Sequence, residues 1–157
     1  MNLYRYFSLL FSYPTEESLR EIEELSGTGD IAGLRSRGVL PGLPLEEVQT
    51  EYTRMFISAY PKVLCPPYES YYREGIVYGN SATRAREWYQ KQGLDFTLEG
   101  EPADHLSVEL EFLAISNDRA FLEKLREWIY EFTTRVKNNS AIYGRCAEDL
   151  EDFLKEA

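Results

Sequence analysis

The chain has 157 residues, of which 43% are hydrophobic, 14% aromatic and 28% charged, a composition that argues against disorder of the whole chain. At this length we expect one domain spanning residues 1–157. Lys and Arg total 17 against 27 Asp and Glu, which gives a net charge of −10. This balance argues against a nucleic-acid partner, because phosphate binding needs clustered cations.

The cysteine pattern and the apolar segments indicate a soluble, cytoplasmic protein. Cys65 and Cys146 form no CxxC pair, so free thiols and no cysteine-based zinc site are predicted. No apolar run approaches the roughly 20 residues that span a bilayer. The apolar start of the chain is interrupted by Arg5 and lacks a small-residue cleavage signature, so it is interpreted as a first helix and not as a signal peptide.

The first two predicted helices flank Pro14. Apolar residues recur at helical spacing from Leu3 to Phe11, and Pro14 ends this helix. Thr15 can cap a second helix that ends at Gly27. Residues 26–44 contain five glycines and two prolines, so a loop is predicted there, with at most one short helix at 31–37.

A third helix is predicted from Pro44 to Phe56, since proline suits the first helical position and Glu46 and Glu47 follow it. The next segment, 60–78, contains three prolines and five tyrosines. It is too interrupted for a long helix and too apolar for a solvent-exposed loop. We expect it to pack against the rest of the protein, with its tyrosines serving either as contact surface or as filler between helices.

Two helices are predicted in the middle of the chain. Asn80 or Ser81 can cap the first, which stops at Gly93. Asp104 can cap the second, which runs over residues 105–115.

The C-terminal part has the clearest amphipathic pattern. Apolar residues form a helical stripe over 122–136, a break follows at 138–140, and a last helix is predicted over 142–154. Trp88 and Trp128 lie on helical stripes and are expected in the core. Sustained two-residue alternation is absent from the sequence, so the predicted class is an all-α helical bundle.

The segment 99–113 is the most unusual in composition, with five carboxylates and the only histidine. On a helix that starts near Asp104, the side chains of His105, Glu109 and Phe112 share one face. In one interpretation Asp104 is only a helix cap, and His105 and Glu109 form an ordinary pair contributing tenths of a kcal/mol. A metal site is disfavoured, because the sequence has one histidine and no HExxH motif and so offers too few ligands. An acid–base catalyst is also disfavoured, because no motif for a nucleophile accompanies these residues.

In a further interpretation this face binds a peptide. The carboxylates would then face the guanidinium groups of a basic segment, such as a twin-arginine peptide, while neighbouring aromatic side chains hold its apolar residues. His105 is the one side chain whose ordinary pKa lies near neutrality, so binding is expected to vary between about pH 6 and 8.

Three motifs in this order resemble the TorD/DmsD/NarJ family of redox enzyme maturation chaperones, over roughly residues 1–155. The first is the segment 52–56, YTRMF; the second is 66–70, PPYES, with Tyr72; the third is EPADH at 101–105, followed by ELEFL at 109–113. Each motif alone is weak, whereas the ordered set on an acidic helical chain is specific.

The resemblance implies a cytoplasmic, TorD-like chaperone that is not an enzyme and has no cofactor or metal of its own. Its partner would be the twin-arginine signal peptide or the apoprotein of a molybdopterin oxidoreductase, held until cofactor insertion is complete. A monomer and a domain-swapped homodimer both fit the family. The residues that the resemblance assigns to peptide binding are Tyr68, Glu69, Ser70, Glu101, Pro102, Asp104, His105 and Glu109.

Two alternatives stay open from the sequence. A nucleotide-binding or hydrolytic protein could use the face of Asp104, His105 and Glu109, although the chain lacks a GxxxxGK[ST] loop. A purely structural helical subunit is the other alternative.

Overall fold

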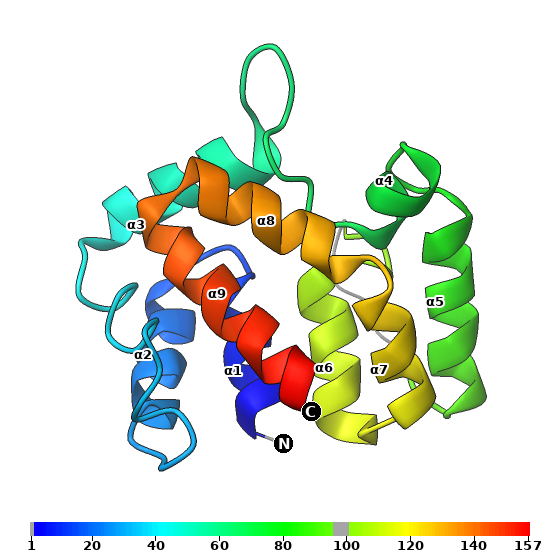
Figure 1. Cartoon of the computed structure of the whole chain (residues 1–157), viewed down its shortest axis with the longest axis horizontal. Coiled ribbons are helices and arrows are strands. Elements are labelled where there is room, and N and C mark those ends of the chain that lie inside the picture. Colours follow the sequence, from blue (N-terminus) through cyan, green and yellow to red (C-terminus); the bar gives the residue numbers. More distant parts are fainter. Residues whose placement is uncertain (1, 96–100) are drawn as a thin grey trace.

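The computed structural model describes residues 2–95 and 101–157 and is built from helices (Figure 1). In chain order they are α1 (Asn2–Leu10), α2 (Glu16–Leu25), α3 (Leu45–Tyr52), the π-helical η1 (Thr53–Ile57), α4 (Glu69–Glu74), α5 (Asn80–Lys91), α6 (Leu106–Ser116), α7 (Arg119–Arg126), α8 (Ile129–Asn139) and α9 (Ala141–Glu156). Within those two ranges no strand occurs, and the β-type pairing is an isolated antiparallel bridge between Tyr68 and His105. The predicted all-α class is confirmed.

The helices pack around a central pair, α1 and α6, which lie against each other along their lengths. Figure 1 shows α9 crossing in front of this pair and α8 running along the top, with α2 and α3 on one side and α4, α5 and α7 on the other. Between η1 and α4 the chain projects from the body as a loop (Figure 1). Within the described ranges, none of the helices is long and apolar enough to cross a membrane.

A cluster of aromatic rings forms the core between α1, η1, α8 and α9. The ring of Phe11 contacts those of Phe56 and Phe132 at centroid distances of 6.2 and 5.6 Å, and Tyr143 lies 5.1 Å from Phe56. Tyr52 donates a hydrogen bond from its hydroxyl to the Phe11 carbonyl at 2.8 Å. Edge-to-face contacts of this kind stabilise more than their buried area alone.

The segment between α2 and α3 is an ordered series of turns, which confirms the predicted loop. Ser36 in this loop is buried, and its N–H donates to Asp149 Oδ2 at 2.7 Å. Its hydroxyl also lies 2.8 Å from the Tyr6 hydroxyl. These contacts tie a glycine-rich segment to α1 and α9.

The predicted helix boundaries are correct in some places and wrong in others. Thr15 caps α2 in a reciprocal capping box with Ser18, as predicted, but the helix ends at Leu25, before the predicted Gly27. The predicted capping of α5 by Asn80 or Ser81 is wrong. Glu74 performs this role, since its Oε1 accepts from the Ser81 N–H at 2.7 Å.

The long amphipathic stripe predicted over 122–136 is interrupted by a turn. The helix α7 ends at Arg126 and α8 begins at Ile129, because Trp128 leaves the helical conformation while its side chain is buried in the core. The predicted break at 138–140 is confirmed, and Ser140 caps α9 by accepting from the Tyr143 N–H at 3.0 Å.

Candidate peptide-binding site

The structure brings together the two sequence motifs that are far apart in the chain. The Leu106 N–H donates to the Pro67 carbonyl at 2.8 Å, and the Glu69 N–H donates to the Asp104 carbonyl at 3.2 Å. These two hydrogen bonds flank the bridge between Tyr68 and His105. The PPYES and EPADH segments therefore form one structural unit at the starts of α4 and α6.

Asp104 does not cap its own helix, which corrects the sequence prediction. Its Oδ2 accepts from the Ser70 N–H at 2.7 Å, in the first turn of α4. The start of α6 is capped by His105 instead, whose Nδ1 accepts from the Ser107 N–H at 3.1 Å. Burial raises the pKa of Asp104, and the hydrogen bonds from Ser70 oppose that rise.

Glu69 and Glu109 form a buried carboxyl pair beneath the surface. Lys124 Nζ donates to Glu69 Oε1 at 2.7 Å, and Arg73 Nε donates to Glu69 Oε2. Burial alone would raise the pKa of Glu69, but the neighbouring Glu109 and the charges of Lys124 and Arg73 lower it. Burial and the neighbouring Glu69 raise the pKa of Glu109, which favours a neutral Glu109 beside an ionised Glu69.

The predicted pair of His105 and Glu109 is not formed, because both carboxyl oxygens of Glu109 are buried without a hydrogen-bond partner among the described residues. His105 is 4% exposed, and burial lowers its pKa to about 4. The imidazole stays neutral between pH 6 and 8, so the predicted titration of His105 near neutrality is wrong.

Tyr68, Glu101 and His105 meet at the surface of this unit. The Tyr68 hydroxyl donates to Glu101 Oε2 at 2.9 Å, and the rings of Tyr68 and His105 are edge-to-face at 5.1 Å. His105 Nε2 lies 3.9 Å from the same Glu101 oxygen. The Glu101 side chain is 39% exposed and is the accessible carboxylate of the predicted set.

The eight predicted residues divide into a buried group and an accessible group. Those whose side chains are buried are Glu69, Ser70, Pro102, Asp104 and Glu109. Their contacts hold the two motifs together. The others, Tyr68, Glu101 and the edge of His105, line a cavity of about 250 Å³.

The rest of that cavity comes from the segment after α1, the α3–η1 region, the segment before α4 and the first turn of α6. These lining residues are Ser12, Tyr13, Tyr52, Phe56, Ile57, Pro67 and Ser107. The sequence prediction did not include Ser12, Tyr13, Ile57 or Ser107 among the candidate residues. The YTRMF motif contains Tyr52 and Phe56, so it was the sequence signal that pointed to this wall. Below, "the aromatic cleft" denotes this cavity and its full set of lining residues.

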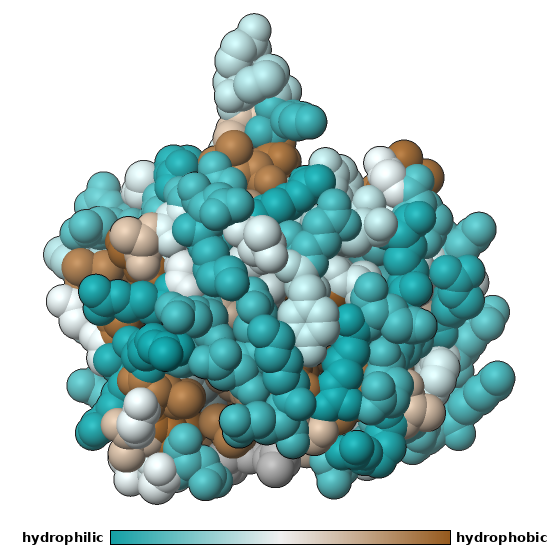
Figure 2. Space-filling view, in the orientation of Figure 1, coloured by the Kyte–Doolittle hydropathy of each residue, from teal (hydrophilic) through white to brown (hydrophobic). Residues whose placement is uncertain are grey.

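Some apolar side chains of the aromatic cleft are exposed, and further exposed apolar side chains occur on the projecting loop and at the turn between α4 and α5. Tyr13 is 46% exposed and Ile57 is 52% exposed, and Tyr60 in the projecting loop is 99% exposed. Figure 2 shows apolar surface where this loop leaves the body and again at the turn between α4 and α5, where Ile76 is 60% exposed. Exposed apolar surface beside a cavity is typical of binding sites.

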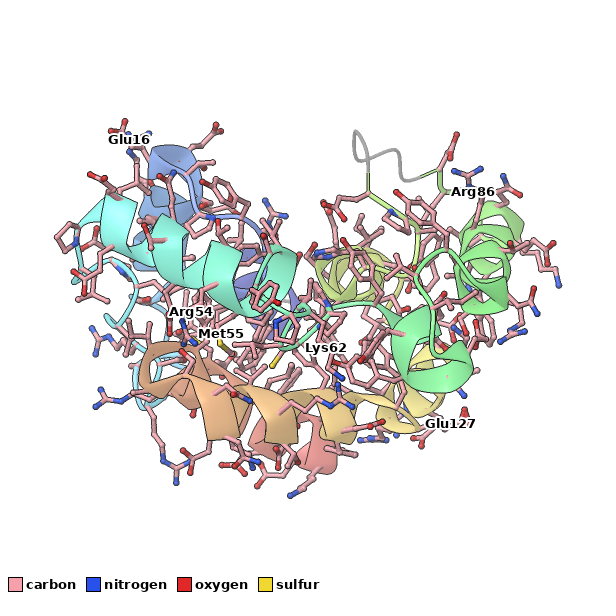
Figure 3. The ribbon with its side chains drawn as sticks, turned by 90° about the horizontal axis from the view of Figure 1, so that it is seen from above. Glu16, Arg54, Met55, Lys62, Arg86 and Glu127 are labelled. Carbon is pink, nitrogen blue, oxygen red and sulfur yellow. The ribbon has the colours of Figure 1, made fainter. Side chains whose placement is uncertain are left out.

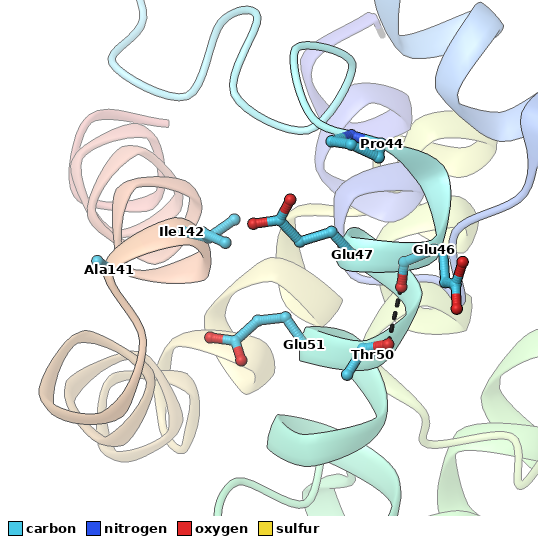
Figure 4. Close-up of a pocket in the computed structure, with 7 residues that line it drawn as sticks. All are labelled: Pro44, Glu46, Glu47, Thr50, Glu51, Ala141 and Ile142. Carbon is cyan, nitrogen blue, oxygen red and sulfur yellow. Dashed lines mark hydrogen bonds between the residues drawn. The ribbon is translucent and has the colours of Figure 1, made fainter.

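A second groove lies between α3 and the start of α9 and has a volume of about 590 Å³ (Figure 4). Its walls include Glu47 and Glu51, whose side chains extend toward Ile142 across the groove. Glu51 is engaged by Arg54 and by the Ser140 hydroxyl, which donates at 2.7 Å. None of the residues that the sequence predicted for binding lines this groove.

The two cysteines are free, as predicted, and both are buried; burial raises the pKa of Cys65 to about 11. Within residues 2–95 and 101–157, no group of three or more His, Cys, Asp or Glu side chains is arranged to hold a metal ion.

Comparisons with known proteins agree with this architecture. Residues 16–156 match the model of the family described as nitrate reductase delta subunit. The crystal structure of a candidate redox enzyme maturation protein from Archaeoglobus fulgidus is 42% identical in sequence, with a TM-score of 0.89 over 98% of this chain and 93% of that chain. No curated protein matches the chain in sequence. The match over residues 16–156 shows that the chain belongs to the nitrate reductase delta subunit family.

Proposed function

We propose that this chain is a cytoplasmic chaperone for the maturation of a molybdopterin oxidoreductase. The chain forms one domain and is not an enzyme. It binds the partner's twin-arginine signal peptide or apoprotein and holds it until the cofactor is inserted. Membership of the nitrate reductase delta subunit family and the similarity to a candidate redox enzyme maturation protein support this role. The TorD/DmsD/NarJ resemblance of the motifs supports it further.

The observation that carries the proposal is the aromatic cleft with one accessible carboxylate at its edge. An apolar side chain of the bound segment enters the cavity between Phe56, Ile57 and Tyr68. A neighbouring cation of the same segment pairs with Glu101, whose Oε2 is already oriented by the Tyr68 hydroxyl. Apolar segments flanked by arginine combine these two features.

The cleft therefore recognises one arginine directly, and not both. Asp104 and Glu109 are completely buried, so neither faces a guanidinium group of the peptide. Their part is to fix the position of Tyr68 and Glu101 through the paired starts of α4 and α6. The apolar residues next to the arginine supply most of the contact area.

The structure does not contain the feature that suggested a nucleotide-binding or hydrolytic protein. That alternative required Asp104, His105 and Glu109 to share an accessible face. In the structure Asp104 holds Ser70, His105 caps α6, and Glu109 is buried beside Glu69. No second candidate function is favoured by the site.

The test is fluorescence anisotropy of a labelled twin-arginine signal peptide titrated with the protein. Three peptides are compared: the original, one with both arginines replaced by glutamine, and one whose apolar residues are replaced by serine. We expect saturable binding of the original, a several-fold loss with glutamine and a larger loss with serine.

The Tyr68→Ala variant is expected to bind the original peptide at least tenfold more weakly, since it removes a cavity wall and the partner of Glu101. A matched variant is Tyr130→Ala, which truncates a half-buried tyrosine on α8 and leaves the cavity unchanged. Equal loss of affinity in the two variants, or no binding of any peptide, would refute the aromatic cleft as the signal-peptide site.

A further inference from the structure

Two cationic side chains with a tryptophan between them form a stripe along α5. Arg84, Trp88 and Lys91 stand at positions i, i+4 and i+7, so they share one face of this helix. Arg86 is also exposed on the outer side, as Figure 3 shows. The helix thus carries three cations and one acid, Glu87, in a chain whose net charge is −10. This local excess of positive charge is opposite in sign to the protein as a whole.

The stripe borders a pocket of about 510 Å³ between α5 and the turn before α7. Its lining residues are Arg84, Glu87, Trp88, Lys91, Gln92 and Asp118. None of them lines the aromatic cleft.

Trp88 is held rigidly at this pocket. Its indole Nε1 donates to Asp118 Oδ2 at 2.9 Å, and its ring packs edge-to-face on Phe121 at 5.5 Å. The sequence predicted a core position for Trp88, whereas the structure leaves its side chain half-buried. An indole already fixed before binding loses little conformational entropy when a partner packs on it, and tryptophan dominates many interfaces for this reason.

The carboxylate of Asp118 is held in place by hydrogen bonds within the protein. Its Oδ2 also accepts from Gln92 Nε2 at 2.6 Å, and its Oδ1 accepts from the Phe121 N–H at 3.1 Å, where it caps α7. Arg84 donates to Ser81 Oγ at 3.1 Å and lies 3.7 Å from Glu74 Oε2, but its side chain is 53% exposed and can turn to a partner. Lys91 is exposed at the end of the helix.

We propose that this pocket is a second docking site, which binds an acidic segment of a protein partner with an apolar or aromatic side chain placed on Trp88. Arg84 and Lys91 are seven positions apart, which corresponds to about 10 Å along the helix. In an extended segment alternate side chains share a face, so two acids four positions apart, about 13 Å along the chain, point the same way as the residue midway between them, and the long side chains of Arg84 and Lys91 cover the difference. Such a segment can place one carboxylate at each cation and its intervening side chain on the indole.

The pocket favours a carboxylate-bearing segment over a polyphosphate. Glu87 and Asp118 line the same pocket as the two cations, so a compact group with several negative charges would meet repulsion from both sides. Two single charges held apart by a peptide avoid that repulsion. This inference goes beyond the proposed function and does not depend on the aromatic cleft.

The test uses the two indole N–H signals of the isotope-labelled protein, which report separately on Trp88 and Trp128. The probe is a synthetic six-residue peptide with two glutamates four positions apart and a phenylalanine midway between them. We expect the Trp88 signal to shift saturably, the buried Trp128 signal to stay in place, and added salt to weaken binding. The same peptide with glutamines in place of the glutamates is expected to bind at least fivefold more weakly.

A double variant, Arg84→Gln with Lys91→Glu, is expected to weaken binding of the glutamate peptide at least tenfold. Glutamine at position 84 removes the cation without placing a second carboxylate beside Glu74, whose oxygen lies 3.7 Å from Arg84, so binding of the twin-arginine peptide at the aromatic cleft is expected to be unchanged. An unmoved Trp88 signal at millimolar peptide, or equal binding by the double variant, would overturn the proposal. Tighter binding of ATP or inorganic phosphate than of the peptide would also overturn it, in favour of a small-anion site.

Discussion

Asp104 Oδ2 accepts the backbone N–H of Ser70 at 2.7 Å, so a residue that precedes α6 in the chain caps α4. The same two segments are joined by the backbone hydrogen bond from Glu69 to the Asp104 carbonyl. Because Tyr68 lies directly before α4 and His105 directly before α6, this cap fixes the wall of the aromatic cleft where those two rings meet. Four experiments follow from this arrangement.

Replacing Asp104 by alanine is expected to lower the free energy of unfolding by about 1–2 kcal/mol, the usual effect of losing a helix cap. Asparagine at this position retains an acceptor oxygen and is expected to recover at least half of the loss. Urea unfolding measures both variants. The specific signature is faster hydrogen exchange at the Ser70 amide.

The control for this experiment is Thr15→Ala, which removes the cap of α2. It is expected to destabilise by a similar amount while the Ser70 amide keeps its protection relative to global unfolding. Unchanged exchange at Ser70 in the Asp104→Ala variant would show that the cap does not hold α4.

The pair of Glu69 and Glu109 is expected to respond very differently to the same isosteric change. Glu69→Gln removes the buried charge that the partly exposed Lys124 and Arg73 face, and is expected to cost about 2–3 kcal/mol because two charge-assisted hydrogen bonds are weakened. Glu109→Gln replaces a group that is already neutral, and is expected to cost no more than about 1 kcal/mol. Urea unfolding at pH 7 compares the two variants, and equal costs would contradict the assignment of the proton to Glu109.

His105 gives a pH dependence whose sign is set by its lowered pKa. The unfolded imidazole takes up a proton as pH falls through about 6.5, whereas the folded chain keeps it neutral down to about pH 4. In that window the unfolded state binds more protons, so the contribution of His105 to stability falls as pH falls. Glu109 contributes with the opposite sign, because its pKa is raised in the folded chain.

The measurement is therefore the difference in unfolding free energy between the wild type and His105→Asn. This variant removes the imidazole and offers an amide oxygen as the cap of α6 in place of Nδ1. From pH 7 to pH 4 the wild type is expected to lose up to about 3 kcal/mol relative to the variant. A difference that stays constant with pH would show that His105 is not held neutral. Peptide binding by the wild type is expected to be flat between pH 6 and 8.

Glu101→Gln is expected to weaken twin-arginine peptide binding about fivefold, as an accessible ion pair contributes about 1 kcal/mol or less. Glu23→Gln is the matched control, since it removes the same charge from an exposed position on α2. Anisotropy titrations of the two variants separate a local contact from the effect of net charge. Equal weakening by both would assign the effect to the overall field of the protein.

Much of the fold could be predicted from the sequence, because helix periodicity and local caps depend on near neighbours. The local sequence determines the start of two helices. Thr15 caps α2 together with Ser18, three residues later, and Ser140 caps α9 directly after a pair of asparagines. The end of α7 was missed because Trp128 continues the apolar stripe in sequence while leaving the helix to fill the core.

The sequence predicted which motifs form the candidate site. It did not predict which carboxyl groups are buried there or which helix Asp104 caps. Carboxylates are expected at the surface by default, so the burial of Glu69 against Lys124 could not be deduced from a single sequence. Asp104 was assigned to the helix that follows it, since a cap supplied from a distant segment has no local signal. Tyr13 and Ile57 lie outside the motifs, and only the packing of the segment after α1 against α3 and η1 brings them to the cleft.

The capping of α4 from a distance also determines when this part of the protein can form. A helix of six residues is far too short to be stable alone in water, and its cap comes from a residue 34 positions further along the chain. During synthesis α4 must therefore wait until Asp104 has left the ribosome and α6 has docked on α1. A partly synthesised chain without α6 lacks the wall formed by Tyr68 and His105, so the aromatic cleft forms only after this helix has been made.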